Sequence, residues 1–256
     1  MRWVKILALS AATALAAMAT VGTDSFRWSG KMTAGQVLEV RGVNGSIHAE
    51  GGSGDEIEVI ARKIGHWSDT SGVRVEVVRH AGGILVCAVY PSGANDCNPE
   101  SAASGMLGSD VRVDFTIRMP AGARFLGRTV NGAVEATSLS ADAEAHTVNG
   151  EVKISTSGAA RADTVNGAIT ASVGQAMGGL RLTTINGGIT LRVPRDASGD
   201  VHASTKNGRI STDFPLRVHG GLSHRSIRGR LGLGGSEWSL TTVNGSICLR
   251  STGRGV

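Results

Sequence analysis

The sequence is poor in aromatic residues, proline and charge. Its 256 residues include four Phe, four Trp, one Tyr and five Pro. So few aromatic rings leave little surface on which bases or flat cofactors stack. Charged residues make up 18% of the chain, and the formal net charge is only +5. A balance this small gives no reason to expect a nucleic-acid partner.

Sequence motifs for metals, phosphates and nucleophilic catalysis are also missing. The three cysteines form no C-x-x-C pair, and no Cys/His cluster has zinc-ligand spacing. No P-loop, H-E-x-x-H or EF-hand pattern is present either. We therefore expect no cofactor, no metal site and no catalytic residues.

Glycine, by contrast, is abundant, with 37 residues, and 41% of the chain is hydrophobic. The glycines show no G-x-y period, which excludes collagen, and the hydrophobic fraction is too high for a disordered chain. Glycine together with Val, Ile and Thr is typical of many short strands joined by tight turns.

The first residues have the pattern of an export signal. Arg2 and Lys5 precede an apolar run over residues 6–19, which ends in the small-x-small sequence Ala17-Met18-Ala19. We predict a signal peptide over residues 1–19 and an exported protein that is periplasmic, cell-surface or secreted. The alternative is an uncleaved anchor, the only membrane contact that we expect. Loss of Arg2 and Lys5 lowers the net charge from +5 to +3.

Export also bears on the cysteines. Cys87 and Cys97 are ten residues apart and flank a turn-rich segment. A disulfide between them is permitted outside the cytosol, but geometry decides whether it forms. Cys248 would then be unpaired.

The clearest signal is an internal repeat built around Asn-Gly. From Asn131 onward, successive corners are 18, 17, 20, 21, 21 and 16 residues apart, if Arg228-Gly229 is counted as one of them. Periods near 20 are typical of stacked repeats. The predicted structural corners are Asn131-Gly132, Asn149-Gly150, Asn166-Gly167, Asn186-Gly187, Asn207-Gly208 and Asn244-Gly245.

Apolar and polar residues alternate on both sides of each corner. Before Asn166, for example, Ala160, Ala162 and Thr164 alternate with Arg161 and Asp163. Period-2 alternation predicts strands with one buried face and one wet face. We expect Asn and Gly at the corner because both tolerate the positive φ of a sharp bend.

We predict an all-β fold, a single-stranded right-handed parallel β-helix (β-solenoid) of about 20-residue coils. In such a stack, residues at equivalent positions of successive repeats lie directly above one another and form a column. The Thr and Asn columns then become ladders of like residues. The alternative is an antiparallel β-meander or barrel with Asn-Gly hairpins. We expect one continuous domain over residues 20–256, with less regular coils over 26–126 and regular repeats over 127–250.

The T-V-N-G repeats, with Val43-Asn44-Gly45, Gly54-Asp55-Glu56-Ile57 and Met119-Pro120-Ala121-Gly122, resemble the bacterial putative-adhesin family of β-helical domains of unknown function. The resemblance covers about residues 33–250. It implies a β-helical, adhesin-like module, and the family supplies no catalytic residues to transfer. Arg228-Gly229 and Lys206 depart from the repeat pattern.

The outward columns argue against an enzyme, because no two carboxylates fall in one column on adjacent repeats. His146 and Asp163 do stack, which we interpret as a surface ion pair. We predict an exported, non-catalytic, adhesin-like surface module of the cell envelope with a structural or binding role. The partner is unknown from the sequence, and glycans and envelope proteins are the candidates.

Two alternative functions stay open. One is a carbohydrate-active enzyme with its site near the 92–109 loop, where Asp96, Glu100, Asp110 and Asp114 lie. The other is a periplasmic sensor or regulatory partner protein.

Overall fold

The structure is a computed structural model that describes residues 25–65, 69–91, 97–100, 110–174, 178–218 and 224–252. The predicted signal peptide, residues 1–19, lies outside the described residues. Within the described ranges no helix is long and apolar enough to cross a membrane.

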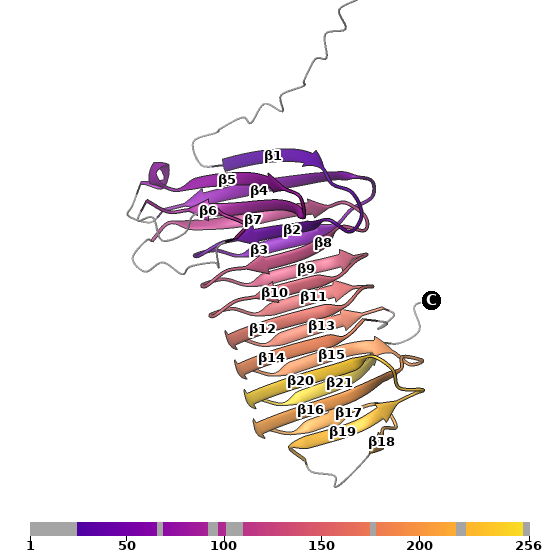
Figure 1. Cartoon of the computed structure of the whole chain (residues 1–256). Helices are drawn as coiled ribbons and strands as arrows, with labels where there is room; N and C mark the ends of the chain where they lie inside the picture. The colour runs from indigo at the N-terminus through magenta and orange to yellow at the C-terminus, as the bar shows by residue number, and fades with distance from the viewer. Residues whose placement is uncertain are drawn as a thin grey trace, which may run out of the picture.

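Short strands account for nearly all the regular structure of the N-terminal half (Figure 1). The elements are β1 (Ser25–Lys31), β2 (Val37–Arg41), β3 (Ile47–Gly51), β4 (Glu56–Ile64), the 3-10 helix η1 (Thr70–Gly72), β5 (Arg74–His80), β6 (Gly83–Val89), β7 (Arg112–Met119) and β8 (Arg124–Arg128).

In the second half, strands of the two sheets alternate along most of the chain. The elements are β9 (Val134–Leu139), β10 (Ala143–His146), β11 (Val152–Thr156), β12 (Ala160–Asn166), β13 (Ile169–Val173), β14 (Leu180–Asn186), β15 (Ile189–Pro194), β16 (Gly199–Asn207), β17 (Ile210–Thr212), β18 (Arg217–Val218), β19 (Ser226–Leu231), β20 (Glu237–Asn244) and β21 (Ile247–Thr252).

These strands form two large mixed sheets in which most pairs are parallel. Sheet A has ten strands in the order β1-β4-β7-β3-β9-β11-β13-β15-β21-β17. Sheet B has eleven, in the order β18-β19-β16-β20-β14-β12-β10-β8-β2-β6-β5. The inward side chains of both sheets meet in one main hydrophobic core, whose residues run from Met32 to Leu249 along the chain.

The predicted right-handed parallel β-helix is wrong, because the sheets are mixed and their strand order departs from the chain order. At one end β4 pairs antiparallel with β1 and β7, and β5 pairs antiparallel with β6. At the other end β19 pairs antiparallel with β16 and β18.

The strand order of the stack also differs from that of a uniform helix near the C-terminus. The last two strands, β20 and β21, lie between the β14/β15 layer and the β16/β17 layer. The repeats carry the same residue types at equivalent positions, so each repeat could stack against several others. The spacing along the chain therefore did not predict which repeats are in contact.

The alternative meander is not matched either. A hairpin joins neighbouring antiparallel strands, whereas the segment at Asn149-Gly150 connects β10 in sheet B with β11 in sheet A. The Asn-Gly pairs therefore mark passages between sheets.

Arg228-Gly229 is not a corner at all. Both residues lie inside β19, where Arg228 faces His202 and Gly229 faces Val201 of β16 in antiparallel register. His224, four residues before Arg228, is exposed. The segment Ser226-Ile227-Arg228-Gly229 resembles the T-V-N-G repeats closely enough to mislead, but it lacks the asparagine that the true corners use.

The predicted alternation itself matches burial in the regular strands. In β12, Ala160, Ala162 and Thr164 are buried, while Arg161 is exposed and Asp163 half-buried. The same pattern holds in β10, β14 and β20. The apolar side of each strand therefore faces the core, and the polar side forms the outer surface of the sheet.

Candidate functional site

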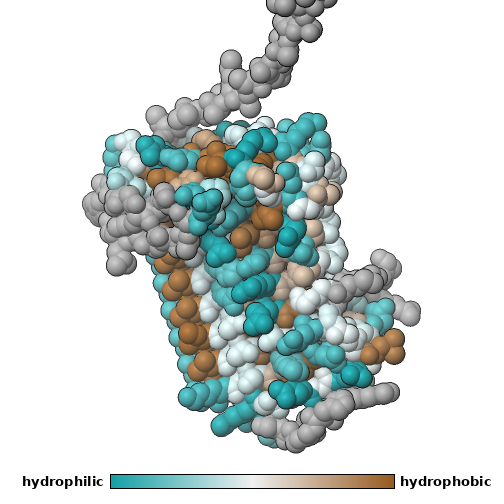
Figure 2. Space-filling view, viewed as in Figure 1, coloured by the Kyte–Doolittle hydropathy of each residue, from teal (hydrophilic) through white to brown (hydrophobic). Residues whose placement is uncertain are grey.

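The predicted corner asparagines lie in one ladder along an edge of the molecule. Each side-chain amide donates to the carbonyl oxygen of the next asparagine at 2.7–2.9 Å. The order, from donor to acceptor, is Asn207, Asn244, Asn186, Asn166, Asn149, Asn131 and Asn44. Residues such as Val148 and Ile185, just before the asparagines, are partly exposed, and Figure 2 shows an apolar band along this edge.

The corner glycines are needed for close stacking and not for a left-handed backbone. Among the predicted corner residues none has a positive φ, so the conformational reason expected from the sequence is wrong. An added Cβ at Gly150 would instead lie 2.0 Å from the carbonyl oxygen of Gly132. Equivalent clashes of 1.9–2.1 Å arise at Gly132, Gly167, Gly187, Gly208 and Gly245.

The threonines before the corners hold these glycines in place. The Thr184 hydroxyl, 1% exposed, donates to the carbonyl oxygen of Gly167 at 2.9 Å. Thr242 does the same to Gly187 at 2.8 Å. A simple ladder of hydroxyls would require the threonines to bond to one another. These threonines instead donate to the backbone of the neighbouring layer.

Cys87 and Cys97 form a disulfide, with their Cα atoms 5.7 Å apart. Cys87 packs with Leu85 and Val89 in a small cluster separate from the main core. Cys248 is a free thiol of intermediate exposure beside the Ser211 hydroxyl.

The carboxylates predicted for an alternative enzyme site have varied surroundings. Asp96 lies outside the described residues, and Glu100 is exposed in a turn. Asp114 accepts a hydrogen bond from the Ser46 amide at 2.9 Å and forms an ion pair with Arg112 at 3.0 Å. Asp110 is half-buried at the start of the β7 segment. Asp114 therefore helps to join β7 to the segment before β3.

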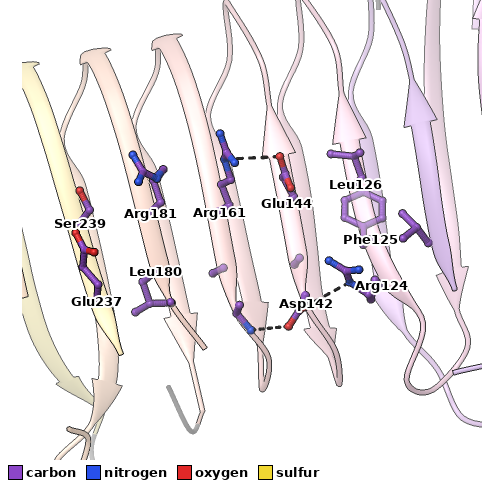
Figure 3. A pocket seen from close by; sticks show the side chains of 15 residues that line it. Arg124, Phe125, Leu126, Asp142, Glu144, Arg161, Leu180, Arg181, Glu237 and Ser239 are labelled. Atoms are coloured by element: carbon purple, nitrogen blue, oxygen red, sulfur yellow. Dashed lines mark hydrogen bonds and ion pairs between the residues drawn. The ribbon is translucent and has the colours of Figure 1, made fainter. Parts of the chain in front are cut away.

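A concavity lies on the outer face of sheet B, where β8, β10, β12, β14 and β20 run side by side (Figure 3). It has a volume of about 420 Å³, and charged side chains surround a floor of small and apolar residues. We call it the sheet B hollow. Its charged residues are Arg124, Asp142, Glu144, Arg161, Arg181 and Glu237.

Two small residues make the hollow. At the start of the strands, one outward column runs from Asp142 through Ala159 and Gly179 to Glu237. The acidic residues at its two ends extend into solvent, whereas Ala159 and Gly179 in the middle carry almost no side chain. The surface is therefore depressed between two carboxylates.

Ion pairs hold one side of the hollow. Arg124 lies 3.4 Å from Asp142, which also accepts a hydrogen bond from the Ala159 amide at 2.9 Å. Arg161 lies 3.7 Å from Glu144, as the dashed line in Figure 3 marks. Acids and bases on neighbouring strands thus fix each other's positions.

His146 and Asp163 form the ion pair that the sequence predicts. The His146 Nδ1 atom lies 3.2 Å from Asp163, and its Nε2 atom lies 2.6 Å from Glu144. Burial raises the pKa of Asp163, but the hydrogen bond from His146 and the charges of His146 and Arg161 outweigh it, so the pKa is lowered overall. Asp163 is therefore ionised at neutral pH.

Arg181 differs from the other arginines of the hollow. It is exposed beside Arg161 in the same outward row (Figure 3). Among the residues that the structure describes, no carboxylate lies within 4.0 Å of its guanidinium group. Sequence reasoning missed this site because one of the two strands beside Arg181 is β20, which comes 50 residues or more later in the chain.

No group of three His, Cys, Asp or Glu side chains in the described ranges is arranged to hold a metal ion. The hollow offers guanidinium, carboxylate and hydroxyl groups for hydrogen bonding at a surface.

Comparisons with known proteins give only distant likenesses. No family model and no curated protein matches the sequence. Among solved structures, the chain is similar to a putative cell adhesion protein from Clostridium sporogenes ATCC 15579. The identity is 10% and the TM-score 0.45, over 88% of this chain and 99% of the other.

A putative adhesin from Bacteroides fragilis NCTC 9343 also matches, with 10% identity and a TM-score of 0.30, over 90% of this chain and 98% of the other. Both neighbours carry the adhesin description that the repeats led us to expect. Because both TM-scores lie below 0.5, the function proposed below rests on the surface of this chain.

Proposed function

We propose that this chain is an exported, non-catalytic surface module with an adhesin-like role, and that it binds through the outer face of sheet B. The observation that carries the proposal is the sheet B hollow, a concave polar surface built on strands that are hydrogen-bonded on both sides. Binding to such a surface requires little ordering of the protein, which favours affinity.

The rigidity of this face comes from its central strands. β12 pairs in parallel with both β10 and β14, and β14 pairs with β20. Side chains on these strands are further held by the Arg124–Asp142 and Arg161–Glu144 ion pairs. An array of fixed groups suits weak contacts repeated along an extended ligand.

The state of the carboxylates supports a binding role over catalysis. A general acid needs a carboxyl whose pKa is raised towards neutrality. The pKa of Asp163 is lowered, and Asp142 and Glu144 each face an arginine. A carboxylate with a lowered pKa, such as Asp163, can bind and orient a ligand, but it is a poor proton donor.

The binding role is tested by offering the purified full chain to immobilised envelope and host-surface polysaccharides. Biolayer interferometry would measure binding, and chromatography of the supernatant would measure released fragments, with and without calcium. We expect reversible binding and no fragments. Turnover by the purified chain, or binding to no surface at all, would overturn the proposal.

Export is tested on the protein recovered from expressing cells. Mass spectrometry of the N-terminus should show that the mature chain begins at Thr20, after cleavage at Ala19. A chain that keeps residues 1–19 and stays in the cytosolic fraction would contradict the proposed location.

A further inference from the structure

We propose that the sheet B hollow, with the outward row that continues from it to Arg228 on β19, binds an acidic polysaccharide, laid across the strands with its anionic groups on Arg181 and Arg228. This inference rests on the proposed function, because it names the ligand class for the same face. It combines two observations. Arg181 has no carboxylate partner among the described residues, and Gly179 leaves the hollow open although the backbone there would accept a side chain.

The charge of the row favours an anion. Across sheet B the outward positions in register are Glu144, Arg161, Arg181, Ser239, His202 and Arg228. Like charges on adjacent strands are destabilising unless they are compensated. Arg161 is compensated by Glu144 and Asp163, but the described residues place no carboxylate within 4.0 Å of Arg181 or Arg228.

The length of the row favours an extended ligand. Arg181 on β14 and Arg228 on β19 are separated by β20 and β16. Three strand spacings correspond to about 14 Å. A single small anion does not reach both arginines, whereas a linear chain with spaced negative groups does.

The groups beside the row favour a sugar chain. Thr183, Thr241 and Ser204 line one side in register, and Asp142, Glu237 and Asp200 lie on the other. Hydroxyls and carboxylates both accept hydrogen bonds from sugar hydroxyl groups. The same carboxylates repel densely spaced phosphates.

The aromatic content of the hollow argues against nucleic acid. Phe125 is the single aromatic residue among those lining it, and it is only 2% exposed. Binding of single-stranded nucleic acid relies on exposed aromatic rings for base stacking. A carbohydrate bearing spaced carboxylates or sulfates fits the surface better.

Gly179 keeps the hollow open, although neither its backbone conformation nor a close contact requires glycine at this position. An added Cβ would meet only the carbonyl oxygen of Glu237, at an ordinary 3.6 Å, and the φ of Gly179 is not positive. A longer side chain at this position therefore fills the hollow while the fold is kept. Gly179→Gln serves as a steric block.

The experiment uses the full chain in isothermal titration calorimetry at low salt. The probes are oligogalacturonate, which carries carboxylates, and sulfated dextran oligosaccharides. Their neutral counterparts are methyl-esterified oligogalacturonate and unmodified dextran. We expect at least one acidic probe to bind at least tenfold more tightly than its neutral counterpart, with affinity falling as salt rises.

The variants locate that binding. Arg181→Gln and Gly179→Gln should each weaken it at least tenfold, and Arg181→Lys should weaken it less. Arg192→Gln is the matched control, because Arg192 is an exposed arginine on the outer face of sheet A. Circular dichroism melting curves identify any variant that fails to fold, and Arg181→Gln tests the site independently of Gly179→Gln.

The outcomes separate the two proposals. Polysaccharide binding that is equal in Arg181→Gln and Arg192→Gln overturns this inference and leaves the proposed function standing. Equal affinity for single-stranded DNA, or for neutral and acidic probes, also overturns it. Binding to no probe and to no surface overturns both.

Discussion

The two ends of the strands in sheet B carry glycines with opposite roles. At the corner end, a Cβ on Gly150 would overlap the carbonyl of Gly132 at 2.0 Å. At the start of β14, a Cβ on Gly179 meets one atom at 3.6 Å. The first glycine is required by the stacking of the corners, whereas the second leaves space at the surface.

This difference separates the repeat that builds the fold from the departures that shape a surface. In the columns of the regular repeats, Thr and Asn form hydrogen bonds to the neighbouring layer, and Gly allows the layers to pack closely. The column of Asp142, Ala159, Gly179 and Glu237 changes at each step, because its side chains face solvent. Variation within an otherwise regular array is where we find the candidate site.

The largest difference is expected when one methyl group is added to a glycine at each end of the sheet B strands. Gly150→Ala should lower the free energy of unfolding by about 3 kcal/mol or more, because neighbouring corners must move apart. Gly179→Ala should change it by less than about 1 kcal/mol. Urea denaturation followed by circular dichroism measures both, and equal effects would refute the distinction.

A smaller loss is expected at the threonines of the corner. Thr242→Val removes the hydroxyl that donates to Gly187 and should lower the free energy of unfolding by about 1–2 kcal/mol. Thr241→Val, at the exposed neighbouring position on the same strand, is the control and should have little effect. If both variants unfold at the same urea concentration, the threonine contact adds no stability.

The asparagine ladder should show a graded effect along its length. Asn166→Ala removes two amide hydrogen bonds, to Asn149 and from Asn186, and should cost about 1 kcal/mol. Asn207→Ala removes one bond at the donor end of the ladder and should cost about half as much. Thermal melts of the two variants compare them, and a reversed order would contradict cooperative stacking.

The smallest effect concerns the charges beside the hollow. Because the pKa of Asp163 is lowered in the folded state, its stabilising contribution is present above the unfolded pKa of about 3.9 and is lost as pH falls through the folded pKa. Asp163 is one-third exposed, so the contribution at neutral pH should stay below about 1 kcal/mol.

The measurement is the free energy of unfolding of wild type and Asp163→Asn between pH 2 and 7. The wild type should lose stability more steeply than the variant below about pH 4. Parallel curves over that range would show that the carboxylate contributes nothing.

The sequence was sufficient to predict strands and their buried faces, because each follows from residues within one repeat. Ala160, Ala162 and Thr164 indicate an inward face without any knowledge of their neighbours. The stacking of His146 on Asp163 was also predictable, because β10 and β12 are consecutive strands of sheet B.

The layer order and the hollow were not predictable in this way. Val201 and Trp238 both match the position beside Leu180, and the structure places Trp238 there. The pairing of β14 with β20 decides which side chains surround Arg181. Information of this kind lies in packing between distant segments, which period and spacing do not encode.

The position of β20 and β21 inside the stack also has a consequence for folding. Before residues 237–252 have joined the stack, β14 presents to β16 the same alternating row that it later presents to β20. The folding chain therefore has a competing partner for β14, in which Asn186 would meet Asn207 directly. The native arrangement requires that this early pairing be opened or avoided, so that residues 237–252 can insert between the β14/β15 layer and the β16/β17 layer.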